Sequence, residues 1–494
     1  MKTLFEDMGV DDKSADSFNI RIDEPSGVQK TVQEVAESKE ASATVRTLEQ
    51  DNGKTFSEST TLGRGWSIFR VPAHVREVDN RAYSPRIVSI GPFHHKEEAL
   101  RAFEDQKERF LRRLQNQMRR RGCEVDLKKA MKEMEEKTRK CYSEDFEGIK
   151  SDDFVQMMVL DGCFIVELLR LYTKSYQGND DAEEEEPILE TRWMVPNIGR
   201  DLLMLENQLP MFVLQKIYDI TNQGANPLAL NKLALRFFEP LRPGKDELSD
   251  DILETIEKQN TNRQHPHLLA LFQYSTFHNS QGNPNASVQT PKSSRPKRYS
   301  ESKYEKIPGK GWVQNATTLR YAGVQFKKKS GNFLDIEYKN TVLTIPTLYI
   351  DDGTSALLRN LIAYEQSNRS AGPYFSCLAV FLDCLVDTVD DINILRDAGI
   401  IKQAKGGDQE VVDLFNSLTK ELEIDMDDCY QLKKHIEAVY SHHKTHEAMV
   451  RFYRALSKLT FLRFITAYLS TLLTAISIWS AVKNCNCEGK KPHT

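Results

Sequence analysis

Three polar residues stand inside an almost wholly apolar stretch, "DLLMLENQLPMFVLQKIY" (Asp201 to Tyr218). They are Glu206, Asn207 and Gln208. A polar side chain in such surroundings costs on the order of 1–3 kcal/mol unless it finds a partner. The group is therefore either a reactive site in a dry pocket or the repair of a break in the backbone.

The proline that follows favours the repair. Pro210 disfavours helical geometry at Leu209 and has no N–H to donate, so a helix must kink or restart there. Asn207 and Gln208 carry both donors and acceptors and can satisfy the groups that a break leaves open. We expect Glu206 to lie near the positive end of the following helix. The sequence predicts a structural role for all three residues.

Other residues keep an enzymatic alternative open. His94 and His95 end the motif "GPFHH", and Glu365 lies in "NLIAYEQ". A hydrolase or transferase could combine these histidines with the carboxylates. It would require His94 or His95 within hydrogen-bond reach of Glu206 or Glu365, in one deep pocket.

Asp351 and Asp352 resemble a paired-carboxylate site just before "GTSALLRN". A turn that leads into a helix explains them better, because Asp and Gly suit turns and Thr354 suits a helix N-cap.

No pattern predicts a metal, a cofactor or a nucleic acid. In "HHKTH" (His442 to His446) the spacing could hold zinc, but His443 stands where a zincin has its glutamate. No phosphate-binding glycine loop and no nucleophile elbow is present. The net charge is only −5, and the basic clusters at 112–122 and 327–329 read as solvated surfaces.

The elements that must position these residues are mostly helices. Residues 151–173 form a helix that is apolar almost all round, which predicts the buried centre of a bundle. In "FLDIEYKNTVLTIP" (Phe333 to Pro346) an alternating run and a β-branched run flank a short turn, which predicts a β-hairpin. Residues 1–65 and the insert at 279–311 have the composition of disordered or flexible segments. The expected folded part is a single helical domain at 66–460.

Residues 464–482 contain no charged side chain, and basic residues bracket them. At 1.5 Å per residue they cover about 28 Å, which predicts a transmembrane helix followed by a short tail at 483–494. Six Ser and Thr hydroxyls lie in this run, and we expect them to bond back to the helix's own carbonyls.

The topology expected with this span places the domain in the cytosol. No apolar signal segment opens the sequence, and more basic residues precede the span than follow it. The eight cysteines show no Cys-x-x-Cys pair, which favours reduced thiols. Asn285, Asn315 and Asn368 begin Asn-x-Ser/Thr sequons, which would stay unmodified in a cytosolic domain.

The chain resembles the plant proteins grouped as domain of unknown function 247. The resemblance rests on five stretches between about Trp66 and Val482. They are "YSPRIVSIGPFHH", "MVLDGCFIVELL", "IGRDLLMLENQLPMFVLQKIY", "ATTLRYAGVQF" and "FLDIEYKNTVLTIPTLYIDDGTSALLRNLIAYEQ". The resemblance implies a mostly helical domain anchored by a C-terminal span, with no established catalytic residues, and an association of some relatives with pollen–stigma recognition.

The predicted fold class is therefore mainly α, a helical bundle with a small β-hairpin and a C-terminal transmembrane helix. The predicted function is that of a non-enzymatic, membrane-anchored protein that acts in recognition, signalling or scaffolding through a protein partner. The alternative is the hydrolase or transferase described above. No cofactor and no nucleic-acid partner is expected.

Overall fold

The computed structural model describes most of the chain beyond residue 65. The described residues are 66–122, 125–176, 186–222, 230–244, 253–254, 265–277, 313–331, 335–403, 406–424 and 430–488. All of them belong to one unit, Arg64–Thr494. The disordered segment predicted at 1–65 and the flexible insert predicted at 279–311 both lie outside the described residues.

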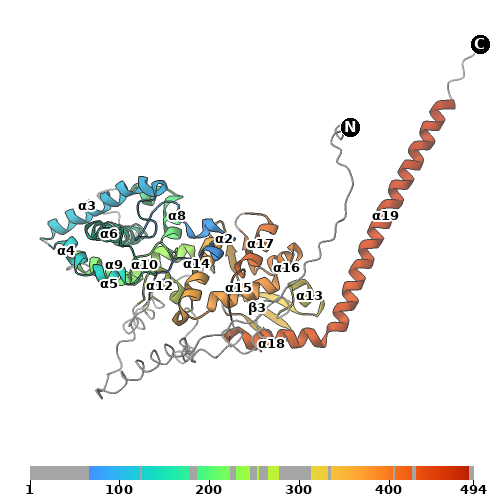
Figure 1. Ribbon diagram of the computed structural model, residues 1–494. Coiled ribbons are helices and arrows are strands. Elements are labelled where there is room, and N and C mark those ends of the chain that lie inside the picture. The colour runs from blue at the N-terminus through green and yellow to red at the C-terminus, as the bar shows by residue number, and fades with distance from the viewer. Residues whose placement is uncertain are drawn as a thin grey trace, which may run out of the picture. The chain divides into compact units, whose positions relative to one another are not determined.

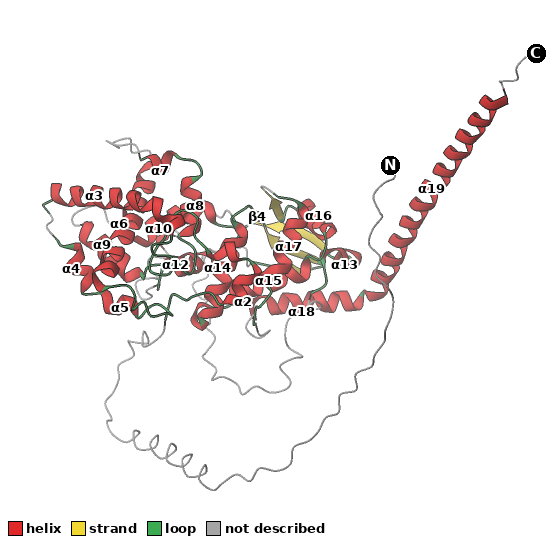
Figure 2. Ribbon diagram, turned by 45° about the horizontal axis from the view of Figure 1, so that its top comes forward, coloured by secondary structure: helices red, strands yellow, loops and turns green. Residues whose placement is uncertain are grey.

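Helices dominate the described residues, as predicted (Figures 1 and 2). Their first half comprises α2 (Ala73–Val78), η1 (Asn80–Tyr83), η2 (Glu98–Phe103), α3 (Glu104–Arg120), α4 (Leu127–Lys132), α5 (Glu135–Arg139), α6 (Ser151–Tyr176), α7 (Pro187–Glu190), α8 (Met194–Asp201), α9 (Met211–Thr221), α10 (Leu230–Phe238), η3 (Glu239–Leu241) and α12 (Leu268–Phe277). The second half comprises α13 (Ala316–Tyr321), α14 (Thr354–Ser367), η5 (Arg369–Ala371), α15 (Tyr374–Leu385), α16 (Val389–Asp397), α17 (Asp408–Leu418), α18 (Tyr430–Thr445) and α19 (Glu447–Glu488).

Helix α6 lies at the centre of the first half, in contact with α3, α4, α9 and α10 (Figure 1). Its side chains are buried from Phe154 through Leu169 without interruption, except at Gln156. Three charged residues of this otherwise apolar helix have protein partners. Asp161 pairs with Lys107, Glu167 accepts from Gln117, and Arg170 donates to the Thr221 hydroxyl. The prediction of a buried bundle centre is confirmed.

The predicted hairpin is present, with more strands around it than expected. β2 (Glu337–Lys339) pairs antiparallel with β3 (Val342–Pro346), and Lys339 lies opposite Val342. The two turn residues between them, Asn340 and Thr341, both have positive φ, as a type I′ turn requires. β1 (Gln325–Lys329) adds a parallel strand beside β3. The basic run at 327–329 is thus part of a strand. β4 (Leu348–Ile350) and β5 (Ile401–Gln403) form a second, parallel pair.

The C-terminal prediction requires a correction. Residues 464–482 belong to α19, a helix of 42 residues. Among the helices of the described residues, none combines the length and the apolarity that crossing a membrane demands, so the predicted transmembrane helix is wrong. Hydroxyl side chains interrupt the apolar run at every turn. They bond back to carbonyls of the helix, for example from Ser470 to Ala467 and from Ser477 to Leu473, as predicted.

The cysteine prediction is also wrong at one position. Cys377, on α15, is disulfide-bonded. The other cysteines whose state the structure gives, Cys141, Cys163 and Cys384, are free thiols.

Candidate functional site

Glu206, Asn207 and Gln208 lie in the loop between α8 and α9, where the helix ends at Asp201 and restarts at Met211 after Pro210. All three side chains are buried. The Glu206 carboxylate accepts from the Val71 amide at 2.7 Å, from Arg76 Nη2 at 2.5 Å and from Arg70 Nη1 at 3.1 Å. Its partners therefore come from the start of the domain, whereas we expected the N-terminus of the following helix. Two guanidinium groups supply the compensating charge that burial demands.

The two amide side chains bind backbone groups on both sides of the break. Asn207 Oδ1 accepts from the Ile90 amide at 2.6 Å, and its Nδ2 donates to the carbonyls of Val88 at 2.9 Å and Asp201 at 3.0 Å. Gln208 Nε2 donates to two upstream carbonyls, at 2.7 and 2.8 Å, and its Oε1 accepts from the Leu269 amide at 3.3 Å. Three of these four donated bonds reach carbonyls at or just after the end of α8, at Asp201, Leu202 and Met204, and the fourth reaches Val88.

The segment Ser84–His95, which we call the tethered segment, is held by hydrogen bonds from buried side chains to its backbone. It contains no helix or strand up to Gly91, so its backbone cannot rely on a regular hydrogen-bond ladder. Side chains take the place of that ladder. Asp201 Oδ2 accepts from the amides of Ile87 at 2.7 Å and Val88 at 3.0 Å, and Asp161 accepts from Gly91 at 2.9 Å.

Asp201, Asp161 and Lys107 are functional parts of this arrangement that sequence reasoning did not select. Each is almost fully buried. Lys107 Nζ lies 2.7 Å from Asp161 Oδ1, 2.6 Å from Glu104 Oε1 and 2.5 Å from the Ser89 carbonyl of the tethered segment. A charged residue in a helix that is otherwise apolar on that side was the available signal, at Asp161 above all.

Burial governs the protonation of these groups. It raises the pKa of Asp201 to about 6, although the amides of Val88, Arg86 and Ile87 oppose the shift. Burial also raises the pKa of Asp161, against the effect of Lys107. For Lys107 burial acts to lower the pKa, but the Asp161 and Glu104 carboxylates outweigh it and the net pKa is raised.

His94 is the one predicted histidine that the structure brings to Glu206. Its Nε2 lies 3.5 Å from Glu206 Oε2, and its Nδ1 lies 2.7 Å from Glu97 Oε1. His95 is half-buried, and burial together with Lys96 lowers its pKa. The two atoms are within ion-pair distance, but His94 Nε2 makes no hydrogen bond, so the histidine–carboxylate half of the enzymatic requirement is not met.

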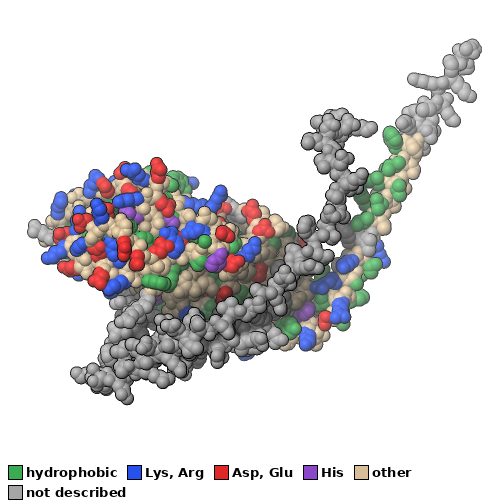
Figure 3. All heavy atoms as spheres, viewed as in Figure 1, with side chains coloured by type: hydrophobic (Ala, Val, Ile, Leu, Met, Phe, Trp, Pro, Cys, Tyr) green, Lys and Arg blue, Asp and Glu red, His purple; other side chains and the backbone are tan. Residues whose placement is uncertain are grey.

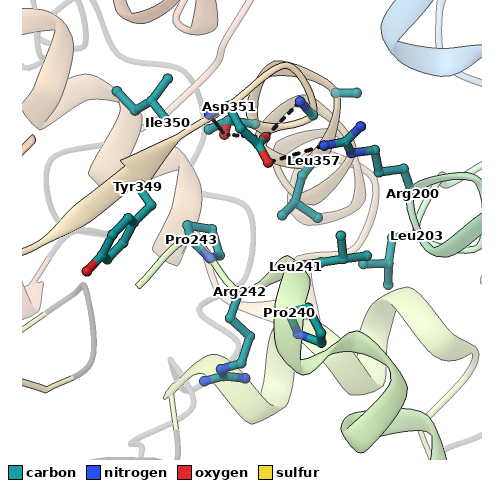
Figure 4. Close-up of a pocket in the computed structure, with 13 residues that line it drawn as sticks. Arg200, Leu203, Pro240, Leu241, Arg242, Pro243, Tyr349, Ile350, Asp351 and Leu357 are labelled. Carbon is teal, nitrogen blue, oxygen red and sulfur yellow. Dashed lines mark hydrogen bonds and ion pairs between the residues drawn. The ribbon is translucent and has the colours of Figure 1, made fainter. Parts of the chain in front are cut away.

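The pocket half of that requirement is not met at the cavities that the described residues form. Hollows of about 410 and 360 Å³ lie between α3 and α4 and beside α5, and none of His94, His95, Glu206 and Glu365 lines them. A smaller cavity is lined by η3, β4 and the start of α14. Its volume is about 80 Å³, and its lining includes Arg200, Leu203, Leu241, Tyr349 and Asp351 (Figure 4). Ligand sites usually measure about 300–1,000 Å³, whereas a water molecule occupies about 30 Å³. The cavity is therefore of a size for a few water molecules. Neither His94, Glu206 nor Glu365 lines it.

Asp351 reaches this cavity but is committed to the turn before α14. Its carboxylate accepts from the Gly353 amide at 2.8 Å, from the Thr354 hydroxyl at 3.1 Å and from Arg200 Nη2 at 3.2 Å (Figure 4). Asp352 is exposed on the same turn. The arrangement is that of a turn entering a helix.

Glu365 belongs to a different cluster from Glu206. It accepts from the amides of Phe375 at 2.9 Å and Ser376 at 2.8 Å, from the Ser376 hydroxyl at 2.9 Å and from Gln273 Nε2 at 2.8 Å. It therefore caps the N-terminus of α15 from the side of α14. Burial raises the pKa of Glu365 to about 7.

This pKa predicts a pH effect. Because the folded pKa of Glu365 lies above the usual value, the folded state holds the proton more tightly, and the stability it contributes is lost as pH rises from about 4.5 to 7. Glu365→Gln removes this titration. The free energy of unfolding of the variant should therefore rise relative to wild type, by on the order of 2 kcal/mol, between pH 4.5 and 7.5. Urea unfolding at a series of pH values measures it, and a difference that stays constant with pH would contradict the assignment.

Among the described residues, no group of three or more His, Cys, Asp and Glu side chains is arranged to hold a metal ion. His442 and His446 stack on one another with ring centroids 4.2 Å apart. His442 Nε2 donates to the Ala322 carbonyl at 2.9 Å, and His446 Nδ1 donates to the His442 carbonyl at 2.9 Å.

The fold and the site define a class: a mainly helical domain whose buried acids and amides are tied to backbone. Comparison with known proteins identifies the family. The model of DUF247, described as a plant protein of unknown function, matches residues 68–482. The chain therefore belongs to this family, and the resemblance found in the sequence is confirmed.

Two curated relatives from Arabidopsis thaliana agree. The UPF0481 protein At3g47200 is 32% identical over 376 residues, which cover 74% of this chain and 74% of the relative. The putative UPF0481 protein At3g02645 is 24% identical over 436 residues, 72% of this chain and 79% of the relative. No solved structure matches the chain.

Proposed function

We propose that this protein is a non-enzymatic interaction protein that acts in recognition, signalling or scaffolding by binding a protein partner. One observation carries the proposal: the large apolar side chains exposed along α19. Every side chain from Arg463 to Ser480 is exposed. Figure 3 shows apolar side chains along this helix. Contiguous apolar surface of this kind marks an interaction site in a folded protein.

The apolar residues favour a helical partner. Ile465, Leu469, Leu472, Ile476 and Trp479 recur at alternating steps of four and three residues, which places them on one face of the helix. This is the spacing at which two helices pack side chains into each other's gaps.

The opposite side of the same helix carries several hydroxyl residues, with the exposed Ile478 among them. Ser470, Thr474 and Ser477 lie along this side, and their hydroxyls are bonded to carbonyls of the helix. The partner that fits this pattern is a helix with its own apolar stripe, bound along one side of α19.

The hydrogen bonds of the candidate catalytic residues also favour a non-enzymatic protein. Hydrogen bonds to the backbone or to neighbouring side chains occupy the polar atoms of four of them: Glu206, Asn207, Gln208 and Glu365. A general base must reach a proton of a bound substrate. None of these residues lines the cavities of about 80, 410 and 360 Å³ among the described residues.

The test compares two pairs of charged substitutions on α19. Leu469→Glu with Leu472→Glu charges the apolar face, and Ser470→Glu with Thr474→Glu adds the same charge to the opposite face. We expect the first pair to abolish proximity labelling of partner proteins by the native full-length chain, and the second pair to preserve it. The unfolding midpoint of the helical domain should stay unchanged in both, because these side chains contact solvent.

Two results would contradict the proposal. Labelling that survives both pairs would place the partner on another surface. Equal loss in both pairs would mean that α19 is enclosed on all sides, which a single partner helix does not do.

A further inference from the structure

Two of the three sequons lie within the described residues, and the structure gives their asparagines different surroundings. Asn315 precedes α13, and Asn368 lies between α14 and η5. Asn285 lies outside the described residues. N-linked glycosylation takes place in the compartment in which disulfides form, and Cys377 of the same domain is disulfide-bonded.

Asn368 holds its sequon in a tight turn. Its Oδ1 accepts from the Ser370 amide at 3.0 Å and from the Ser370 hydroxyl at 2.7 Å. Both bonds use the oxygen of the amide. Nδ2 makes one long contact, with the Tyr364 hydroxyl at 3.4 Å. Arg369 and Ser370 are exposed. A substituent on Nδ2 would therefore leave both bonds of the turn intact and displace only the long contact with Tyr364.

Asn315 is arranged differently. Its Nδ2 donates to the Asp387 carboxylate at 3.1 Å, and its Oδ1 caps α13 through the Thr318 amide at 3.0 Å. The hydroxyl of its sequon residue, Thr317, is 2.7 Å from the Asp391 carboxylate. Charge-assisted bonds of this kind are roughly twice as strong as neutral ones. A substituent on Asn315 Nδ2 would have to share the space of Asp387.

We propose that Asn368 is a site of N-linked glycosylation and that Asn315 is not. The donor class is an oligosaccharide carried on a lipid diphosphate. Transfer forms a bond between Asn368 Nδ2 and the anomeric carbon of the first sugar and breaks the bond from that carbon to the diphosphate oxygen. Nδ2 loses one proton, and the lipid diphosphate leaves with the electron pair. The domain then faces the oxidising side of a membrane system, in place of the cytosolic position expected from the sequence.

The experiment uses the full chain from its native cells, with Asn285→Gln introduced so that the insert cannot contribute. Tryptic peptides are treated with a peptide-N-glycosidase, which converts a glycosylated Asn to Asp and is read by mass spectrometry. We expect conversion at Asn368 and an unmodified Asn315. Ser370→Ala, which destroys the sequon and keeps Asn368, should abolish the conversion. Ser370→Thr, which preserves the sequon, should retain it.

An Asn368 peptide that is recovered wholly unmodified would overturn the proposal and restore the cytosolic expectation. Modification of Asn315 would equally overturn the distinction drawn between the two sites. Neither outcome bears on the protein partner of α19, so this inference and the proposed function fail separately.

Discussion

Replacing Asn207 by Ala should lower the free energy of unfolding of the helical domain by about 3–5 kcal/mol. The substitution leaves the buried Ile90 amide and Val88 carbonyl without their partner, and it removes one of the two donors to the Asp201 carbonyl, which also accepts from the Met204 amide. Each such group costs about 1–3 kcal/mol when it is desolvated and unpaired. Urea unfolding of the purified domain measures the loss.

A matched control is available on α8. Asn197 Nδ2 donates to the Trp193 carbonyl at 2.7 Å, but on a solvent-accessible face. Asn197→Ala should therefore cost less than about 1 kcal/mol, since water replaces the lost bond. An Asn207→Ala protein as stable as the Asn197→Ala protein, but unable to engage its partner, would refute the structural role and return Asn207 to the candidates for a binding site.

Replacing Gly91 by Ala should be comparably damaging, with a loss of about 2–5 kcal/mol. Gly91 has φ +73°, a conformation that costs a residue with a side chain roughly 1–2 kcal/mol. A Cβ at this position would also lie 2.6 Å from the Gln208 carbonyl oxygen and 3.2 Å from the Tyr142 hydroxyl. The nearer atom is backbone, so the contact is relieved only by moving the loop that carries Glu206, Asn207 and Gln208.

Gly148 provides the control for this substitution. A Cβ there meets nothing within 4 Å, and its φ is not positive. Gly148→Ala should change the free energy of unfolding by no more than about 0.5 kcal/mol. If Gly91→Ala proves equally mild, the tethered segment does not pass against the Gln208 carbonyl as closely as the structure places it.

Local sequence features predicted the elements but not their distant partners. The burial of α6 follows from an apolar run, and the hairpin from alternation beside a turn, because both signals lie within a few residues of one another. The repair role of Asn207 and Gln208 followed from Pro210 alone. The partners of Glu206 did not follow from any such signal. Val71 precedes Glu206 by 135 residues, and no local pattern specifies a contact over that separation.

The errors have physical causes as well. The prediction of a transmembrane helix at 464–482 rests on the absence of charge, whereas the hydroxyls of this run reduce the apolarity that a membrane helix needs. The prediction of a solvated surface at 327–329 is not among the errors, because these lysines lie on an edge strand, where Lys is common, and Lys327 and Lys328 are exposed. No Cys-x-x-Cys spacing marks the disulfide of Cys377 in the sequence.

Native-state hydrogen exchange tests the central claim, that buried acids and amides fix the tethered segment as scaffold. The decisive backbone N–H groups are those of Val88, Ile90 and Gly91, which the structure bonds to Asp201, Asn207 and Asp161, together with the N–H of Val71, which lies before the segment and bonds to Glu206. We predict that they exchange as slowly as the core of α6, with opening free energies close to global unfolding. Exchange as fast as that of exposed turns would contradict this. It would show a mobile segment beside His94 and Glu206, the behaviour expected of an active-site loop.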